Sequence, residues 1–211
     1  MEKKKIANPA PLGLAGFALT TFVLSFYNAG ILPGEAVAIV FPLALFYGGL
    51  AQFLAGMWEF KIGNTFGATA FTSYGAWWMF YALLQYSISL GWIDLGRYEL
   101  TAMGLVLISW AIFTFYMWIA TFNLNKALWS IFLTLWITFT LLALGDLVAP
   151  IFGIVGGYVG LVCASIAWYT SAAEVINETT GRDVLPLGDK VTDKQASINN
   201  MKVSLEEGAK S

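Results

Sequence analysis

Long stretches without any charged residue dominate the chain. Six of them occur, separated by short segments that carry the acidic and basic residues, and they cover 6–34, 36–58, 62–93, 100–125, 127–145 and 147–173. A membrane-spanning helix needs about 20 mostly apolar residues, and every stretch is long enough. The pattern therefore predicts an all-α, polytopic membrane protein with six transmembrane helices joined by short loops.

The composition supports this fold class and sets the domain boundaries. Of the 211 residues, 58% are hydrophobic and only 11% are charged, whereas an ordinary globular domain has about 25% charged residues. The first apolar stretch is too long for the core of a cleaved signal peptide. We expect residues 1–188 to form one permease domain. Residues 189–211, rich in Lys, Asp, Ser and Glu, are expected to form a flexible cytoplasmic tail.

The charged segments also predict the orientation. With six spans, both termini lie on the same side of the membrane. That side receives most of the basic residues, namely Lys3, Lys4, Lys5, Lys61, Lys126, Arg182, Lys190, Lys194, Lys202 and Lys210, while the other side receives Arg97. The excess of Lys and Arg on cytoplasmic loops then places both termini in the cytoplasm. Glu59 and Lys61 mark the cytoplasmic edge of the second span.

The third predicted span carries a polar stripe. Four hydroxyl side chains follow one another at helical spacing after Gly63, namely Thr65, Thr69, Thr72 and Ser73. Lipid offers hydroxyls no hydrogen bonds, so they must face partner helices or a polar path. Asn64 stands at the N-cap position, where free backbone N–H groups attract small anions. Gln52, in the middle of the second span, must likewise have a polar partner.

Two further helix faces have more than one interpretation. In the first span one face carries Gly13, Phe17, Thr20, Leu24 and Asn28, and it is either a packing seam or part of a pore lining. The last span has glycine and alanine at helical spacing, including Ala167, which favours close helix packing. Cys163 in the same span is expected to be a small packing residue.

The sequence lacks the side chains that enzymes use. There is no His, no cluster of metal ligands, no Gly-x-Ser-x-Gly motif and no phosphate-binding loop. We therefore expect no enzyme activity, no cofactor and no metal site. Asp and Glu occur only at span ends, so the spans are expected to present no charge to a solute. An anion must then pass neutral donors, or pass as its protonated acid, and a small carboxylic acid has a pKa of roughly 4. An apolar constriction that excludes water would serve as the gate.

Several ordered motifs resemble one family. Asn8, Pro9, Pro11 and Gly13 belong to Asn-Pro-Ala-Pro-Leu-Gly-Leu at 8–14, and the matching pieces continue at 28–30, 46–52, 63–67, 70–75 and 174–188. Over roughly residues 6–188 the chain is similar to the acetate uptake transporter family, which includes bacterial succinate–acetate permeases and yeast acetate and ammonia-linked membrane proteins.

The resemblance implies an assembly, a substrate and site residues. It implies a ring-shaped homohexamer in the plasma membrane, with a separate path through each protomer for acetate or succinate, accompanied by protons. By motif, the constriction is formed by Phe17, Tyr74 and Leu135, and Ala167 tunes substrate size. The residues expected to guide the carboxylate are Thr20, Gln52, Asn64, Thr72, Ser73 and Tyr74. The expected partners are the acid, protons and membrane lipid, and no nucleic acid.

Three functions stay open at this point. The first is a channel-like or proton-coupled permease for acetate and other small monocarboxylates. The second is a channel for ammonia or another small neutral solute, which a charge-free path would serve equally well. The third is a structural membrane protein without flux. For the permease, Leu135→Val or Ala167→Ser is expected to broaden acceptance toward larger acids such as lactate.

Overall fold

The computed structural model describes residues 6–188, so the predicted tail at 189–211 lies outside the described part. The described residues form only helices and connecting turns. In chain order the elements are α1 (Ala10–Asn28), η1 (Gly34–Ile39), α2 (Val40–Leu43), η2 (Ala44–Ala51), α3 (Gln52–Ile62), α4 (Thr65–Ser89), η3 (Gly96–Tyr98), α5 (Glu99–Ala120), η4 (Thr121–Asn123), α6 (Lys126–Leu147) and α7 (Pro150–Thr180).

The helices make six long rods, as the sequence predicts. Five segments are both long and apolar enough to cross a membrane, namely Ala10–Asn28, Gly34–Ile62, Gly96–Asn123, Lys126–Leu147 and Pro150–Thr180. The sixth rod is α4, whose 25 residues reach about 37 Å at 1.5 Å per residue. Its hydroxyl, glycine and tyrosine content makes it less apolar than the other five. Because it packs among them, it completes the set of six spans.

The second span changes its helical winding along its length. It begins as a 3₁₀ turn in η1, becomes α-helical in α2, widens into a π-helix over η2 and returns to α-helix at Gln52. Such π segments interrupt the regular hydrogen-bond ladder and are frequent at functional sites. A glycine inside it lets α1 approach closely, since a Cβ at Gly48 would lie 2.6 Å from the Thr20 hydroxyl.

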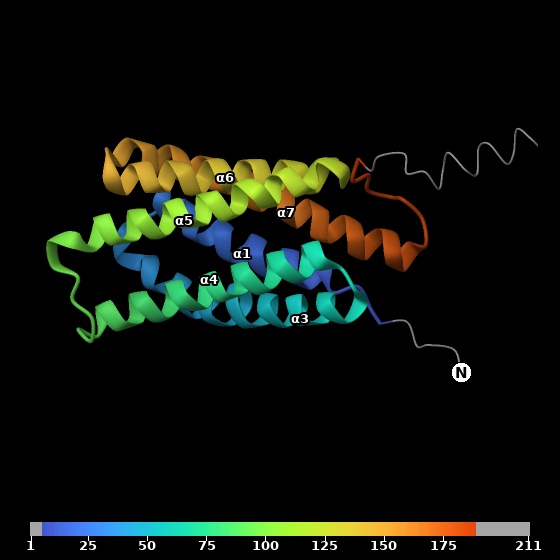
Figure 1. The fold of residues 1–211 in the computed structure, drawn as a ribbon, viewed down its shortest axis with the longest axis horizontal. Coiled ribbons are helices and arrows are strands. Elements are labelled where there is room, and N and C mark those ends of the chain that lie inside the picture. Colours follow the sequence, from blue (N-terminus) through green and yellow to red (C-terminus); the bar gives the residue numbers. More distant parts are fainter. Residues whose placement is uncertain (1–5, 189–211) are drawn as a thin grey trace, which may run out of the picture.

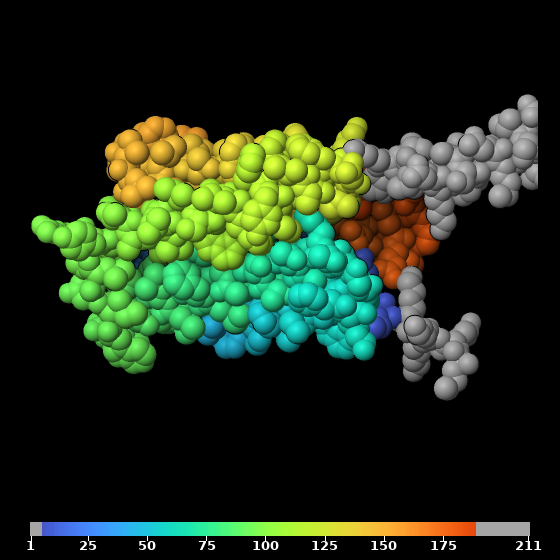
Figure 2. All heavy atoms as spheres, in the orientation of Figure 1, coloured from blue at the N-terminus to red at the C-terminus, as the bar shows by residue number. Residues whose placement is uncertain are grey.

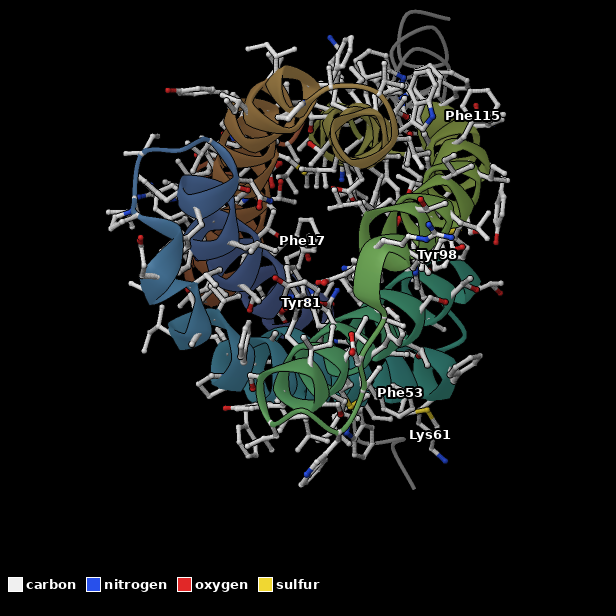
Figure 3. The ribbon with its side chains drawn as sticks, turned by 90° about the vertical axis from the view of Figure 1, so that its left-hand side faces the viewer. Phe17, Phe53, Lys61, Tyr81, Tyr98 and Phe115 are labelled. Carbon is white, nitrogen blue, oxygen red and sulfur yellow. The ribbon has the colours of Figure 1, made fainter. Side chains whose placement is uncertain are left out.

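The six rods form a closed ring in which each rod packs against its neighbours in the sequence. Figure 1 shows them running back and forth along the long axis, and α7 returns to pack along α1. Viewed down that axis in Figure 3, the rods surround a central region toward which Phe17 points, while Phe53, Lys61 and Phe115 lie on the outside. In Figure 2, α4, α5 and α6 lie side by side across one face.

The two ends of the ring differ in what they carry. One end, here called the terminal end, holds the start of α1, the α3–α4 and α5–α6 turns and the segment after α7 (Figure 1). The opposite end, here called the loop end, holds the connections at 29–33, 90–98 and 148–149. Both ends of the described chain therefore lie at the terminal end, as an even number of spans requires.

Glycines in α7 close the ring against α1. A Cβ on Gly157 would lie 2.6 Å from the carbonyl carbon of Asn28 and 2.7 Å from the Cα of Ala29. Backbone atoms cannot move aside as a flexible side chain can, so only glycine fits at this crossing. The small-residue face of the last span is thus a packing surface, as one interpretation of the sequence held.

The segment after α7 folds back onto the start of α6. The Asn177 side chain accepts hydrogen bonds from the backbone N–H groups of Val184 and Leu185, and donates to the Leu185 carbonyl at 2.9 Å. The carbonyls of residues 187 and 188 then accept from the N–H groups of residues 127 and 126. These bonds satisfy donors at the start of α6 that have no partner within the helix.

The α1–α7 crossing yields a stability prediction. Gly157→Ala places a methyl group against the backbone of α1, and overpacking of this kind costs about 1–3 kcal/mol. Gly153→Ala, one turn earlier in the same helix, is the matched control, because its Cβ would meet only the Gly145 Cα at an ordinary 3.7 Å. Thermal unfolding in detergent, followed by tryptophan fluorescence, should show a lower midpoint for Gly157→Ala alone. Equal midpoints for the two variants would contradict this account of the crossing.

Candidate functional site

Two cavities lie one after the other inside the ring. The terminal cavity is lined by residues near the start of α1 and α4, including Ala10, Leu14, Asn64 and Phe66. The loop-end cavity is lined by later residues of the same helices and by α6, including Leu24, Asn28, Trp78 and Leu142. Three side chains line both cavities, namely Phe17, Tyr74 and Leu135.

The cavities differ in size. The space open to the centres of water molecules is about 100 Å³ in the terminal cavity and about 40 Å³ in the loop-end cavity. Roughly 10–15 Å³ of such space is needed for one water. The terminal cavity thus has room for several waters or a small organic acid, and the loop-end cavity for far less.

The three shared side chains form an apolar neck between the cavities. They come from three separate helices, α1, α4 and α6, and all are at most 5% exposed. The ring centroids of Phe17 and Tyr74 are 6.2 Å apart. No hydrogen bond joins any of the three side chains to another, so apolar contact alone fills the neck.

Tyr74 is held firmly at this level by α5. Its hydroxyl lies 2.9 Å from the Thr114 hydroxyl, and Thr114 in turn donates to the Trp110 carbonyl at 2.7 Å. Since the Thr114 proton is used by that carbonyl, Tyr74 is the donor in the first bond. Phe139 stacks near the Tyr74 ring, with centroids 6.5 Å apart. The phenol therefore presents its ring to the neck and keeps its hydroxyl engaged with α5.

The polar groups lie on either side of the neck. In the terminal cavity they are Gln52, Asn64 and Glu174. The Gln52 side chain is 1% exposed and its Oε1 atom has no hydrogen-bond partner. In the loop-end cavity the polar groups are Thr21, Ser25, Asn28 and Thr138. The Thr21 hydroxyl is also buried without a partner, so each cavity offers an unused hydrogen-bonding atom to a solute.

Four residues expected at the path lie outside both cavities: Thr20, Thr72, Ser73 and Ala167. Thr20 faces Gly48, and Thr72 faces Gly56 of α3. The cavity face of α4 runs instead through Phe71, Tyr74 and Trp78. Successive residues on a helix are rotated by about 100°, so Thr72 turns toward α3 while the neighbouring aromatic residues line the cavities. In α1, Thr21 rather than Thr20 reaches a cavity.

The acidic residues also differ from expectation. The sequence predicts a path without carboxylates, yet Glu174 lines the terminal cavity. Glu59, expected at the membrane edge beside Lys61, is 0% exposed, whereas Lys61 points outward (Figure 3). Helical spacing explains this, because Gln52, Gly56 and Glu59 follow one another on the inward face of α3. That spacing was the available signal, and it was missed because Glu59 stands near a turn.

Asn64 joins Glu59 to the start of α4. Its side-chain oxygen accepts from the Gly67 N–H at 3.2 Å and caps the helix, and its amide group donates to Glu59 Oε2 at 2.8 Å. These two bonds fix the orientation of the amide. One amide hydrogen is left over, because a carboxamide has two N–H donors, and Asn64 lines the terminal cavity.

The motif at 8–14 ties the terminal end together. Asn8 accepts from the Ala10 N–H at 3.0 Å and donates to Glu174 of α7. The carbonyl of Pro11 accepts from the Ser171 hydroxyl at 2.7 Å. Gly13 leaves space for the Phe71 ring, which a Cβ would meet at 2.6 Å. The motif thus anchors α1 on α7 beside the terminal cavity.

Metal ligands are not gathered anywhere in residues 6–188, where no group of three or more His, Cys, Asp or Glu side chains could hold an ion.

Comparison with known proteins gives consistent matches over most of the chain. The family model described as the GPR1/FUN34/yaaH family matches residues 1–186. The succinate-acetate/proton symporter SatP of Escherichia coli strain K12 is 40% identical over 190 residues, covering 90% of this chain and 99% of that protein. Ammonia transport outward protein 2 of Saccharomyces cerevisiae is 38% identical over 205 residues, covering 89% of this chain and 70% of that protein.

A solved structure matches as well. The structure of the bacterial acetate channel SatP superposes with a TM-score of 0.82 at 41% identity, covering 87% of this chain and 100% of that chain. These matches confirm the family resemblance and the all-helical membrane fold inferred from the sequence. The matched proteins are named as transporters or a channel, which confirms the expectation of transport rather than catalysis.

The Asn64 contacts predict a difference between two helix caps. Asn125 caps α6 in the same way, accepting from the Leu128 N–H at 2.8 Å, and Asn125→Ala should cost about 1 kcal/mol. Asn64→Ala removes an equivalent cap and also leaves the buried Glu59 carboxyl without its partner, which adds about 1–3 kcal/mol. Denaturant unfolding in detergent compares the two. If both variants lose the same stability, the Asn64–Glu59 bond contributes nothing.

Proposed function

The chain belongs to the GPR1/FUN34/yaaH family, and from this premise we propose that it carries acetate and other small monocarboxylic acids across the membrane. The solute path runs along the axis of the helix ring. The observation that carries the proposal is that Phe17, Tyr74 and Leu135, from three different helices, line both cavities. Any solute that moves from one cavity to the other passes these three side chains.

The apolar neck determines the form in which an acid crosses. An ionised carboxylate loses its hydration there and meets no cation, which is strongly unfavourable in a low-dielectric medium. The protonated acid has no net charge and is close in size to a few waters. Acetate therefore arrives as the anion, crosses the neck as the neutral acid and releases its proton beyond it. This supports proton-coupled or channel-like transport.

Neutral hydrogen-bonding groups would guide the acid to the neck from either side. In the terminal cavity the free Gln52 oxygen accepts from a protonated acid, and the remaining Asn64 N–H donates to a carboxylate. Beyond the neck, the unpartnered Thr21 hydroxyl takes the corresponding role. Four residues line neither cavity and would act indirectly, through the packing of the helices that form the lining, namely Thr20, Thr72, Ser73 and Ala167. Ala167 would influence which acids fit the path through the packing of α7.

The orientation follows from charge. Lys61, Lys126 and Arg182 lie at the terminal end, and Arg97 lies at the loop end. Basic residues favour the cytoplasmic face, so the terminal cavity opens to the cytoplasm in a plasma-membrane protein. Large apolar side chains cover the outside of the rods, where they meet lipid and, in the ring-shaped hexamer that the family resemblance implies, neighbouring copies.

A second function has one specific observation in its favour. The yeast relative is named an ammonia transport outward protein, and ammonia is a small neutral solute that an apolar neck also admits. The size of the terminal cavity favours a carboxylic acid, since its space of about 100 Å³ holds several waters and ammonia is no larger than one water. Uptake of labelled acetate and labelled methylamine into proteoliposomes, with and without a pH gradient, separates the two functions.

The neck predicts a change in selectivity. Leu135→Ala widens the constriction and should raise lactate uptake relative to acetate by at least about tenfold, the scale of one methylene in an apolar pocket. Leu142→Ala is the matched control, because Leu142 lines only the loop-end cavity, and its lactate-to-acetate ratio should stay unchanged. Proteoliposome uptake of both labelled acids measures the ratio. An unchanged ratio in Leu135→Ala would remove Leu135 from the constriction.

A further inference from the structure

Glu59 is a buried carboxyl group that the transport path described so far does not use. It lies in α3, one turn before the α3–α4 connection, and is 0% exposed. Its Oε2 atom accepts one hydrogen bond, from the neutral Asn64 amide, at 2.8 Å. Its Oε1 atom is buried and has no hydrogen-bond partner.

The surroundings of Glu59 offer a negative charge one neutral hydrogen-bond donor and no cation. No described residue forms an ion pair with it, and Lys61 on the same helix points outward (Figure 3). The groups that face it from other elements are Asn64, which is neutral, and Glu174 of α7, whose charge repels a carboxylate. A buried ionised carboxylate with one neutral donor and no cation is costly. A proton on Oε1 removes that cost.

Glu59 is also separated from the terminal cavity by very little. Gly67 lines that cavity, and a Cβ at Gly67 would lie 2.7 Å from the Glu59 carboxyl carbon and 2.8 Å from Oε2. Because Gly67 has no side chain, the Glu59 carboxyl group packs directly against the backbone of a residue that lines the cavity. Asn64, the hydrogen-bond partner of Glu59, lines the same cavity.

We propose that Glu59 is the proton-exchange group of the terminal cavity, which deepens the proposed function and rests on it. A solute carboxylate in the cavity takes the Glu59 proton through water: the O–H bond at Glu59 breaks, an O–H bond forms on the solute, and Glu59 is left as a carboxylate. The neutral acid then crosses the neck. Glu59 regains a proton from the aqueous phase at the terminal end, and all steps reverse for transport in the other direction.

Glu59→Gln tests the proposal, because glutamine cannot exchange a proton yet keeps an oxygen that accepts from Asn64. In proteoliposomes the variant should take up acetate several-fold more slowly at neutral pH, and its rate should follow the concentration of acetic acid already protonated in solution. Glu35→Gln, in the exposed η1 segment at the loop end, is the control and should keep the wild-type rate and pH profile. A wild-type rate and pH profile in Glu59→Gln would overturn the proposal.

A second readout does not depend on transport. The carbonyl stretch of a protonated carboxyl group should appear in the infrared spectrum of the wild-type protein and of Glu35→Gln at neutral pH, and should be missing from Glu59→Gln. Where Glu59→Gln fails to fold, Glu59→Asp replaces it, and its band should be shifted because the shorter side chain loses Asn64. An unshifted band, or a band that persists in Glu59→Gln, contradicts the assignment. If the wild-type protein shows the band but transports no acetate, the proposed transport function is wrong, and the assignment of a protonated Glu59 stands.

Discussion

The cost of placing a charge where neither water nor a counter-ion can reach it governs this structure. Six mostly apolar rods enclose two cavities, and the side chains that line both are Phe17, Tyr74 and Leu135, which offer nothing to replace the hydration of an ion. In the proposed function, a solute therefore gives up its charge before it passes these side chains. The same cost acts on the protein's own groups, since the buried Glu59 carboxyl has one neutral donor. Solute and protein thus face the same physical requirement, and one proton can satisfy both in turn.

Because the helices form a closed ring, the three neck residues meet at one level along its axis. The neck residues lie far apart in the sequence, and they meet because α7 returns to pack on α1 through the backbone contact at Gly157. Around them, the bond from Tyr74 to Thr114 and the aromatic rings of α5 and α6 hold the phenol in place. In the proposed function, these packed side chains select among small acids by size.

The two sides of the neck have different chemistry. The terminal side combines a larger cavity with an amide oxygen, an amide N–H and the Glu174 carboxyl group, whereas the loop-end side offers hydroxyls and Asn28 in a smaller space. The proposed proton exchange therefore falls on the terminal side. In the same proposal the neck selects by size and by polarity, so the two tasks fall to separate residues.

The sequence alone determined the six long helices and the family, because charge-free length and ordered motifs are local properties of the chain. The family resemblance also singled out Phe17, Tyr74 and Leu135, which line both cavities. Only the tertiary structure decided which face of each helix meets the path. Neighbouring positions such as Thr20 and Thr21 differ by about 100° of rotation around the helix axis. The local sequence pattern does not specify which other helix each of these positions faces. The burial of Glu59 could not be predicted for the same reason. A carboxylate near a turn is normally solvated, and Glu59 is buried because Asn64 and Gly67 pack against it.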